Sequence, residues 1–274
     1  MLRVINDIIP LGWTLFGGAV RDLIINDILP DDLDFFLTGG IDEAWDESAL
    51  NEFGYNPHAA SKPWINRVKE VKNELNKIFT IKEIDHDPNC NYTTKHVVLK
   101  VKHGIVGIDG QIKFKIDLIS SRLHKDQLDF NENGFEFDND GLHYNNEVAI
   151  NPIDFINYQK NIWNGNLTMT ENGYNEVKGK KYRGRIRRVM LSRTAKFLNK
   201  DWQINQEHVH EALEENGVII NNSNPFCDSC GYIIHQKYYV NYWHPYWDHT
   251  GDKKSYHPEC HYKKHGGDII AFNY

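Results

Sequence analysis

The pattern of hydrophobic and polar positions predicts an N-terminal half built from short strands and amphipathic helices. Period-two alternation marks the strands, and helical spacing of apolar positions marks the helices. The Asp109-Gly110 pair predicts a hairpin turn between the last two strands. The predicted segments are strands over 13–16, 33–37, 96–102 and 112–119 and helices over 19–28, 42–53 and 63–79. Together they indicate an α+β fold with a small mixed sheet.

The pattern changes in the second half of the chain. Two helices are predicted over 185–199 and 206–215, joined by a short polar loop, and the last part is aromatic and rich in Cys and His. We therefore predict three parts: a head over 1–165, a basic helical neck over 166–220 and a C-terminal module over 221–274.

Composition and charge narrow the class of protein. The chain has 274 residues, of which 40% are hydrophobic and 25% charged, as is usual for globular proteins. It contains no apolar run long enough for a membrane span and no basic-then-apolar leader, so we expect a soluble, cytoplasmic protein with no membrane partner. The net charge of −7 argues weakly against a bulk polyanion binder. However, the segment 178–200 contains ten Lys or Arg residues and no Asp or Glu.

Two neighbouring features in the head point to phosphate and metal chemistry. Gly17 and Gly18 lie between a strand and a helix, where backbone N–H groups and the helix N-terminus favour an anion. Asp32 and Asp34 alternate on the following strand, so both carboxylates face one side. Asp117 on the last strand is the candidate third carboxylate. Three converging carboxylates suit two Mg²⁺ ions in phosphoryl transfer.

These motifs resemble a known family. The stretches Phe16-Gly17-Gly18-Ala19-Val20-Arg21-Asp22 and Asp32-Leu33-Asp34-Phe35-Phe36 are similar to the head-domain signature of class II nucleotidyltransferases. This group of the polymerase-β superfamily comprises tRNA CCA-adding enzymes and bacterial poly(A) polymerases. Further similarity lies in Phe137–Asn145, Ile150–Asp154 and the Arg-rich stretch from Arg185. The resemblance spans about 12–37 and 112–200.

The resemblance implies a polymerase-β-like head that transfers a nucleotide from an NTP to an RNA 3′ end, for instance that of a tRNA, and releases pyrophosphate. By this likeness the metal-binding catalytic residues are Asp32, Asp34 and Asp117. The implied nucleotide-binding residues are Gly17, Gly18, Arg21, Asp22, Asp140, Arg185 and Arg188. In the family Asp22 braces the phosphate-binding loop.

Two departures from the family pattern bear on specificity. Gly134-Phe135 stands at the place of an arginine pair that helps to hold the nucleotide, and Glu136 replaces the Asp that follows it. In the neck, Lys181–Arg185 keeps the last Arg of the family's base-reading motif but not its Asp. Without that carboxylate, the site is not expected to discriminate C from A in the family's way.

Several functions remain open from the sequence. The basic neck favours an RNA acceptor, with Arg185 and Arg188 at steps that place them together on a helix. The alternatives are a nucleotidyltransferase that modifies a protein or small molecule, and a non-catalytic NTP- or RNA-binding relative. The three carboxylates argue against the last, since binding alone does not need them. The sequence does not indicate an oligomeric state.

The C-terminal module carries a pattern typical of zinc. Cys227-x-x-Cys230 and His257-x-x-Cys260 are two pairs of ligand residues, which together suit one tetrahedral structural Zn²⁺ ion in a treble-clef or zinc-ribbon-like arrangement. His261 is the alternative fourth ligand. A redox role for the Cys-x-x-Cys pair is the main rival.

Overall fold

A computed structural model describes most of the chain. The described residues are 1–30, 32–39, 50–51, 54–55, 62–86, 96–103, 112–119, 122, 128–145, 148–178, 185–204, 206–242 and 254–265. They form two compact units, one of residues 1–125 and 133–155 and the other of residues 126–132 and 156–274. Within the described ranges, no helix has both the length and the apolar character that crossing a membrane requires.

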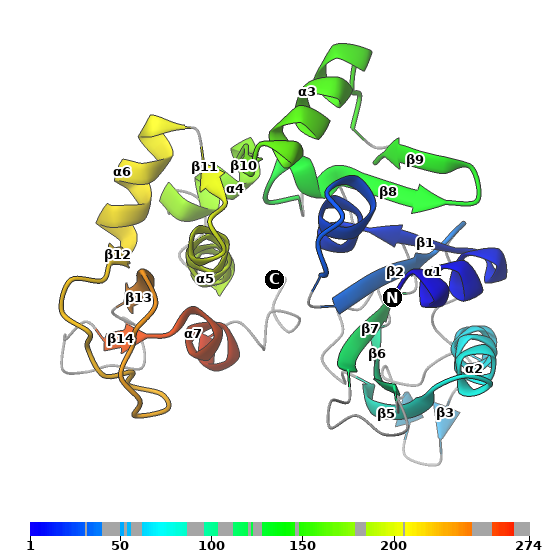
Figure 1. Ribbon diagram of the computed structural model, residues 1–274. Coiled ribbons are helices and arrows are strands. Elements are labelled where there is room, and N and C mark those ends of the chain that lie inside the picture. The colour runs from blue at the N-terminus through cyan, green and yellow to red at the C-terminus, as the bar shows by residue number, and fades with distance from the viewer. Residues whose placement is uncertain are drawn as a thin grey trace. The chain divides into compact units, whose positions relative to one another are not determined.

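Unit 1 is built on a seven-stranded mixed sheet (Figure 1). Its strands lie in the order β5-β6-β7-β2-β1-β8-β9. β2 and β7 are parallel, and each other neighbouring pair is antiparallel. The strands are β1 (Trp13–Phe16), β2 (Asp32–Leu37), β5 (Thr80–His86), β6 (His96–His103), β7 (Ile112–Ile119), β8 (Phe135–Asp138) and β9 (Gly141–Tyr144). The α+β fold class and the predicted antiparallel pairing of β6 with β7 are confirmed, and the predicted Asp109-Gly110 turn lies outside the described residues.

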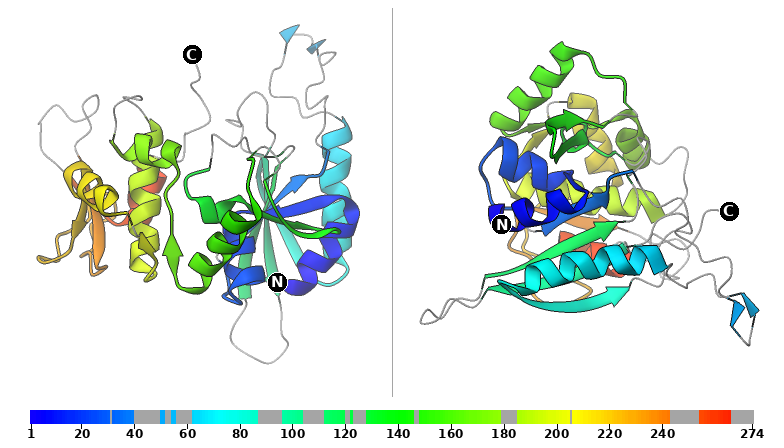
Figure 2. Two further views of the ribbon diagram at one scale, coloured as in Figure 1. Left: turned by 90° about the horizontal axis from the view of Figure 1, so that it is seen from above. Right: turned by 90° about the vertical axis from the view of Figure 1, so that its right-hand side faces the viewer.

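One face of this sheet is apolar and packs against helices. Alternate residues of β1 and β2, among them Leu15 and Phe35, are fully buried. Trp13 of β1 contacts Trp64 of α2, with 5.7 Å between the ring centroids. Helix α2 lies beside β5 along the sheet (Figure 2). The packed helices are α1 (Leu2–Ile8), continued by η1 (Ile9–Leu11), and α2 (Lys62–Asn76).

The predicted helix over 19–28 is shorter and wider than a regular α-helix. It contains the π-helix η2 (Val20–Ile25), and the chain turns out of it at Asp27, whose φ is +53°. The predicted helix over 42–53 is wrong at its end, where β3 (Leu50–Asn51) pairs with β4 (Gly54–Tyr55). Asn and Gly at the hairpin corner favour a tight turn over a helix. The residues 42–49 and 52–53 lie outside the described part.

Unit 2 is mainly helical before its C-terminal module. Helix α5 has the predicted bounds, and α6 is shifted from the prediction by one residue. A segment around Phe130 joins this unit, with its ring edge-on to Phe197 at 5.2 Å. Its elements are β10 (Asn166–Leu167), α4 (Glu171–Lys178), α5 (Arg185–Asn199), β11 (Gln203–Ile204) and α6 (Glu207–Asn216), and η4 (Asn131–Gly134) and α3 (Pro152–Trp163) are each divided between the two units. The chain passes between the units at 125–133 and again inside α3. The three-part division of the chain stays a prediction.

The C-terminal module contains a three-stranded antiparallel sheet and a short helix. Its elements are β12 (Val218–Ile220), β13 (Tyr238–Tyr242), β14 (Lys254–Tyr256) and α7 (Pro258–His265). Cys227, Ile234, Tyr239 and Tyr256 form a small buried cluster. Within the described part of the module, this cluster is small and buries little apolar surface.

Candidate functional site

Three carboxylates converge on the second face of the unit 1 sheet. Asp32 and Asp34 lie two residues apart on β2, and Asp34 is the direct partner of Asp117 on the parallel strand β7. A carboxylate oxygen from each residue lies within 4.8 Å of those from the other two, and all three residues are partly buried. The alternation of β2 and its register with β7 therefore build one acidic cluster. Such a cluster could bind Mg²⁺.

The same row of the sheet carries a second polar group. Phe16 on β1 pairs with Asp34 on one side and with Glu136 on β8 on the other, so the three side chains share a face. Glu136 is two strands from Asp34, a spacing of about 10 Å. His143 on β9 extends the row, with Nδ1 at 3.5 Å from Oε2 of Glu136.

Glu136 also holds an arginine that the sequence reasoning missed. Nη2 of Arg122 donates to Oε2 of Glu136 at 2.9 Å, and the guanidinium lies 5.1 Å from the centre of the Phe36 ring. Burial raises the pKa of Glu136, while the charges of Arg122 and His143 act in the opposite direction. The sequence carries no signal for this pair because the fourteen-residue separation gives it no regular spacing.

The glycine turn between β1 and η2 has the conformation that its sequence requires. Gly17 has φ of +68°, a region that favours glycine. Its N–H donates to the carbonyl of Phe135 at 3.2 Å, so this donor is already used inside the fold. The helical turn begins at Gly18, and the first N–H groups of a helix have no partner within it. An anion at this turn would meet the N–H groups that follow Gly17.

Arg21 is buried beneath this turn. Its side chain is 3% exposed, Nε donates to Oδ1 of Asp22 at 2.6 Å, and Nη1 donates to Oδ1 of Asn133 at 2.6 Å. A Cβ placed on Gly18 would lie 3.6 Å from Nη2 of Arg21. The guanidinium thus ties the turn to η4. Asn133 was missed by the sequence reasoning, because 112 residues separate it from Arg21.

The remaining predicted nucleotide-binding residues lie apart from the acidic cluster in the sequence. Asp140 is exposed in the turn between β8 and β9, and its N–H donates to Oδ1 of Asp138 at 2.9 Å. Arg185 and Arg188 lie in the first turn of α5, in the other unit, and their side chains are outside the described part. Their roles stay predictions.

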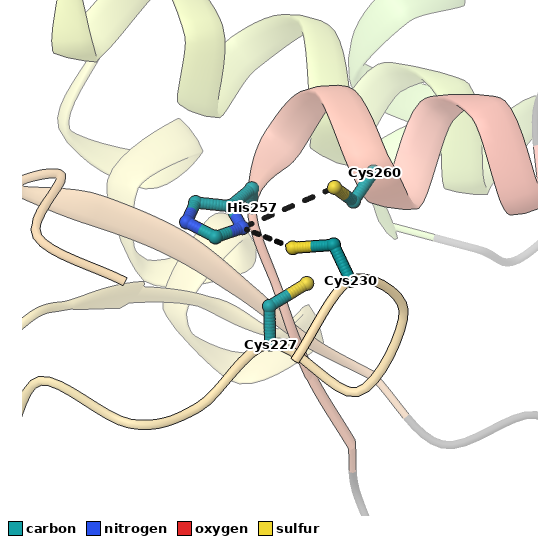
Figure 3. A group of neighbouring side chains, drawn as sticks. All are labelled: Cys227, Cys230, His257 and Cys260. Atoms are coloured by element: carbon teal, nitrogen blue, oxygen red, sulfur yellow. Dashed lines mark hydrogen bonds between the residues drawn. The ribbon is translucent and has the colours of Figure 1, made fainter. Parts of the chain in front are cut away.

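The predicted zinc ligands form a second cluster. One ligand atom from each of Cys227, Cys230, His257 and Cys260 lies within 4.8 Å of the others (Figure 3). Nδ1 of His257 is 3.5 Å from Sγ of Cys230 and 3.9 Å from Sγ of Cys260. Cys227 and Cys230 lie on the loop between β12 and β13, and His257 and Cys260 lie at the start of α7. The cluster could hold zinc.

The pKa values of two thiols in this cluster favour a bound cation. Burial is the largest influence on the Cys227 thiol and opposes its ionisation, but hydrogen bonds from backbone N–H groups outweigh burial and lower the pKa of Cys227 to about 6. Burial and the neighbouring sulfur atoms of Cys230 and Cys227 raise the pKa of Cys260 to about 12. The Cys227 thiolate therefore forms readily, whereas ionisation of the Cys260 thiol is unfavourable. A bound cation would offset the cost of ionising Cys260.

The structure favours His257 over His261 as the fourth ligand. His261 is fully buried, and its Nδ1 is hydrogen-bonded to Oγ of Ser192 on α5 at 2.5 Å. It is one residue beyond Cys260, on another side of α7. The sequence spacing did not decide whether His257 or His261 is the fourth ligand. The hydrogen bond of His261 to Ser192 on α5 favours His257.

Comparison with known proteins gives one distant likeness. No family model matches the chain, and no curated protein matches it. A solved structure, the complex of a CCA-adding enzyme with CTP, is similar with a TM-score of 0.39 and 15% sequence identity. The similarity covers 78% of this chain and 41% of that chain, so the present chain spans less than half of its length. At this level, function has to be argued from the residues of the site.

Proposed function

We propose that the protein is a metal-dependent nucleotidyltransferase that transfers a nucleotide from an NTP to an RNA 3′ end and releases pyrophosphate. The observation that carries this proposal is the convergence of Asp32, Asp34 and Asp117 within 4.8 Å. The cluster lies on β2 and β7, and β2 is the neighbour of β1, which ends at the Gly17-Gly18 turn. Phosphate binding and metal binding are thereby assigned to adjacent parts of one sheet.

The acidic cluster suits two Mg²⁺ ions. Its residues offer oxygen ligands from two strands, and like charges this close repel each other unless a cation lies among them. Asp32, Asp34 and Asp117 would hold the ions, which supply charge neutralisation for the attacking hydroxyl and for the departing pyrophosphate.

The chain's own residues hold and orient the reactants. The backbone N–H groups after Gly17 bind the triphosphate, and Arg21 with Asp22 keeps the turn in place through the contact with Asn133. The 3′ oxygen of the acceptor forms a bond to the α-phosphorus as the bond from that phosphorus to the bridging oxygen breaks. Pyrophosphate leaves with the electron pair, and the hydroxyl proton passes to water. Asp140 is the remaining nucleotide contact that we propose in unit 1.

An RNA acceptor is favoured by one basic segment of the second unit. The segment 178–200 is purely basic among its charged residues, and Arg185 and Arg188 lie in the first turn of α5. Such a segment suits phosphates or a stacked base. The loss of the family's neck carboxylate supports addition without strict discrimination between C and A.

We propose one structural Zn²⁺ ion in the C-terminal module. Cys227, Cys230, His257 and Cys260 supply four protein ligands, which leaves no open position for substrate. The ion would stabilise a module whose buried cluster is small. Substitution of Co²⁺ for Zn²⁺ tests the ligand set, since a tetrahedral site with thiolates gives intense visible absorption. A protein that binds neither metal would contradict this assignment.

Label transfer tests the proposed activity. The full-length protein with Mg²⁺ is incubated with each of the four α-³²P-labelled NTPs, in the presence of total RNA and total cell protein. The proposal predicts label on RNA that is removed by ribonuclease and not by protease. Label on protein would assign the chain to the protein-modifying branch instead. Bound NTP without transfer to either acceptor would contradict catalysis.

A further inference from the structure

Helix α7 connects the metal cluster to helix α5. Cys260 of α7 belongs to the cluster, and the next residue, His261, contacts α5. The His261 ring is fully buried, lies 5.5 Å from the ring of Tyr256, and is hydrogen-bonded through Nδ1 to Oγ of Ser192. Ser192 is itself 2% exposed. A ligand residue and a buried helix contact are therefore neighbours on one short helix.

A second polar contact joins the module to the same helix. The side chain of Asn199 donates from Nδ2 to the carbonyl of Tyr238 and accepts from the Tyr238 N–H, each at 2.8 Å. Both backbone groups belong to the first residue of β13. Ser192 and Asn199 are seven residues apart, about two turns of α-helix, so they share one side of α5. The module thus makes polar contacts with α5 at two points along the helix.

Among the described residues, the apolar cluster inside the module is small. Helix α7 has eight residues, fewer than an isolated helix needs in water. The buried cluster that surrounds Cys227 contains three other residues. Cys227 and Cys230 lie on the first loop, whereas His257 and Cys260 lie at the start of α7. The four ligands therefore join this loop to the start of α7, and Asp228 of the same loop exchanges hydrogen bonds with Ser255 of β14.

We propose that Zn²⁺ in this cluster acts as a clamp that stabilises helix α5. This inference rests on the zinc part of the proposed function. The ion ties the first loop to the start of α7, α7 places His261 against Ser192, and the aligned β13 places its backbone against Asn199. When the ion is removed, α7 loses its fixed end and both contacts with α5 weaken. The metal thereby acts on the helix that carries Arg185 and Arg188.

Hydrogen exchange followed by mass spectrometry tests this coupling in the full-length protein. Zinc content is first measured on the purified protein, with one Zn²⁺ per chain expected. Exchange is then compared before and after treatment with a strong chelator. Amides of α5 over 190–199 should exchange at least about tenfold faster without zinc, because local opening sets their rate. Amides of β1 and β2 serve as the internal reference and should not change.

The possible outcomes separate the two proposals. A protein without zinc would overturn the metal assignment. A protein that holds one Zn²⁺ but shows unchanged α5 exchange after chelation would overturn the clamp and leave the metal assignment standing. Readdition of Zn²⁺ to the chelated protein should restore slow exchange in α5, and failure to do so would also count against the clamp.

A pair of Ser→Ala variants tests the contact itself in zinc-loaded protein. Ser192→Ala removes the hydrogen bond to His261 and keeps a good helix former, so one Zn²⁺ per chain should be retained. Loss of this one bond should speed α5 exchange by about two- to tenfold. Ser229→Ala, the same change at an exposed position between two ligands, is the matched control and should leave α5 unchanged. Equal α5 exchange in the two variants would overturn the proposed path through His261.

Discussion

Asp34 and Asp117 are direct partners on adjacent parallel strands, and with Asp32 they bring three carboxylates within 4.8 Å of one another. Like charges directly opposite on a sheet destabilise it. A cation bound among the three carboxylates would neutralise part of this charge and relieve the repulsion. We therefore expect the cluster to bind a metal ion.

Asp117→Asn should therefore have opposite effects on stability and on metal binding. Without metal the melting temperature should rise, because one of the repelling charges is gone. Binding of Mn²⁺, measured by calorimetry as a stand-in for Mg²⁺, should weaken at least about tenfold for the loss of one charged ligand. Asp201→Asn, at an exposed position in unit 2, is the control for metal binding and should leave the Mn²⁺ affinity unchanged. Unaltered Mn²⁺ affinity in Asp117→Asn would contradict the metal assignment.

Gly17→Ala tests the conformation of the glycine turn. Nothing lies within 4 Å of a Cβ at this position, so the cost comes from the backbone angle alone. A left-handed residue with a Cβ costs about 1–2 kcal/mol, and the free energy of unfolding in urea should fall by that amount. A variant as stable as the wild type would show that the turn does not need positive φ.

A comparison of His257→Ala with His261→Ala should show which histidine binds zinc and which one packs against α5. His257→Ala should bind zinc far more weakly, since it removes a ligand of the cluster. His261→Ala should retain one Zn²⁺ per chain and lose stability through the buried contact with Ser192. Atomic emission measurements of zinc and thermal unfolding distinguish the two. Loss of zinc from His261→Ala with retention in His257→Ala would reverse the assignment.

Glu132 should make stability depend on pH in a specific direction. It is fully buried, and burial raises its pKa above the usual 4.5, although the N–H of Thr168 and the side chain of Asn161 oppose that rise. A raised folded-state pKa contributes stability below the unfolded value, and this contribution is lost as pH rises through the folded pKa. The free energy of unfolding of wild type relative to Glu132→Gln should therefore fall as pH increases from 4.

Urea unfolding at several pH values checks this prediction. Glu211→Gln, at an exposed position of α6, is the matched control and should show a much flatter difference from wild type across the same range. If the difference in unfolding free energy between wild type and Glu132→Gln does not vary with pH, burial does not govern the pKa of Glu132.

Local pattern predicted much of the fold. Alternation located β1, β2, β6 and β7, and helical spacing with basic and apolar positions gave the bounds of α5. The same alternation placed Asp32 and Asp34 on one face, and the β7 pattern supplied Asp117. These features depend on neighbours in the sequence or on regular strand pairing, which a single sequence displays.

Contacts between distant segments could not be predicted in this way. The register that sets Glu136 beside Phe16, and the hydrogen bond from Arg21 to Asn133, depend on how whole elements pack. Spacing alone left both His257 and His261 as ligands, because each lies within one turn of Cys260. The helical pattern over 42–53 failed at Leu50 because turn residues favour a hairpin there.

The most direct test of the central claim compares Asp34→Asn with wild type in nucleotidyl transfer. A short RNA with a 3′ hydroxyl, labelled NTP and Mg²⁺ are mixed with excess enzyme, and RNA extension and pyrophosphate release are followed together. We expect equal amounts of both products from wild type, a rate reduced at least about a hundredfold in Asp34→Asn, and an unchanged rate in Asp201→Asn. Undiminished transfer by a folded Asp34→Asn protein would contradict the assignment of catalysis to the acidic cluster.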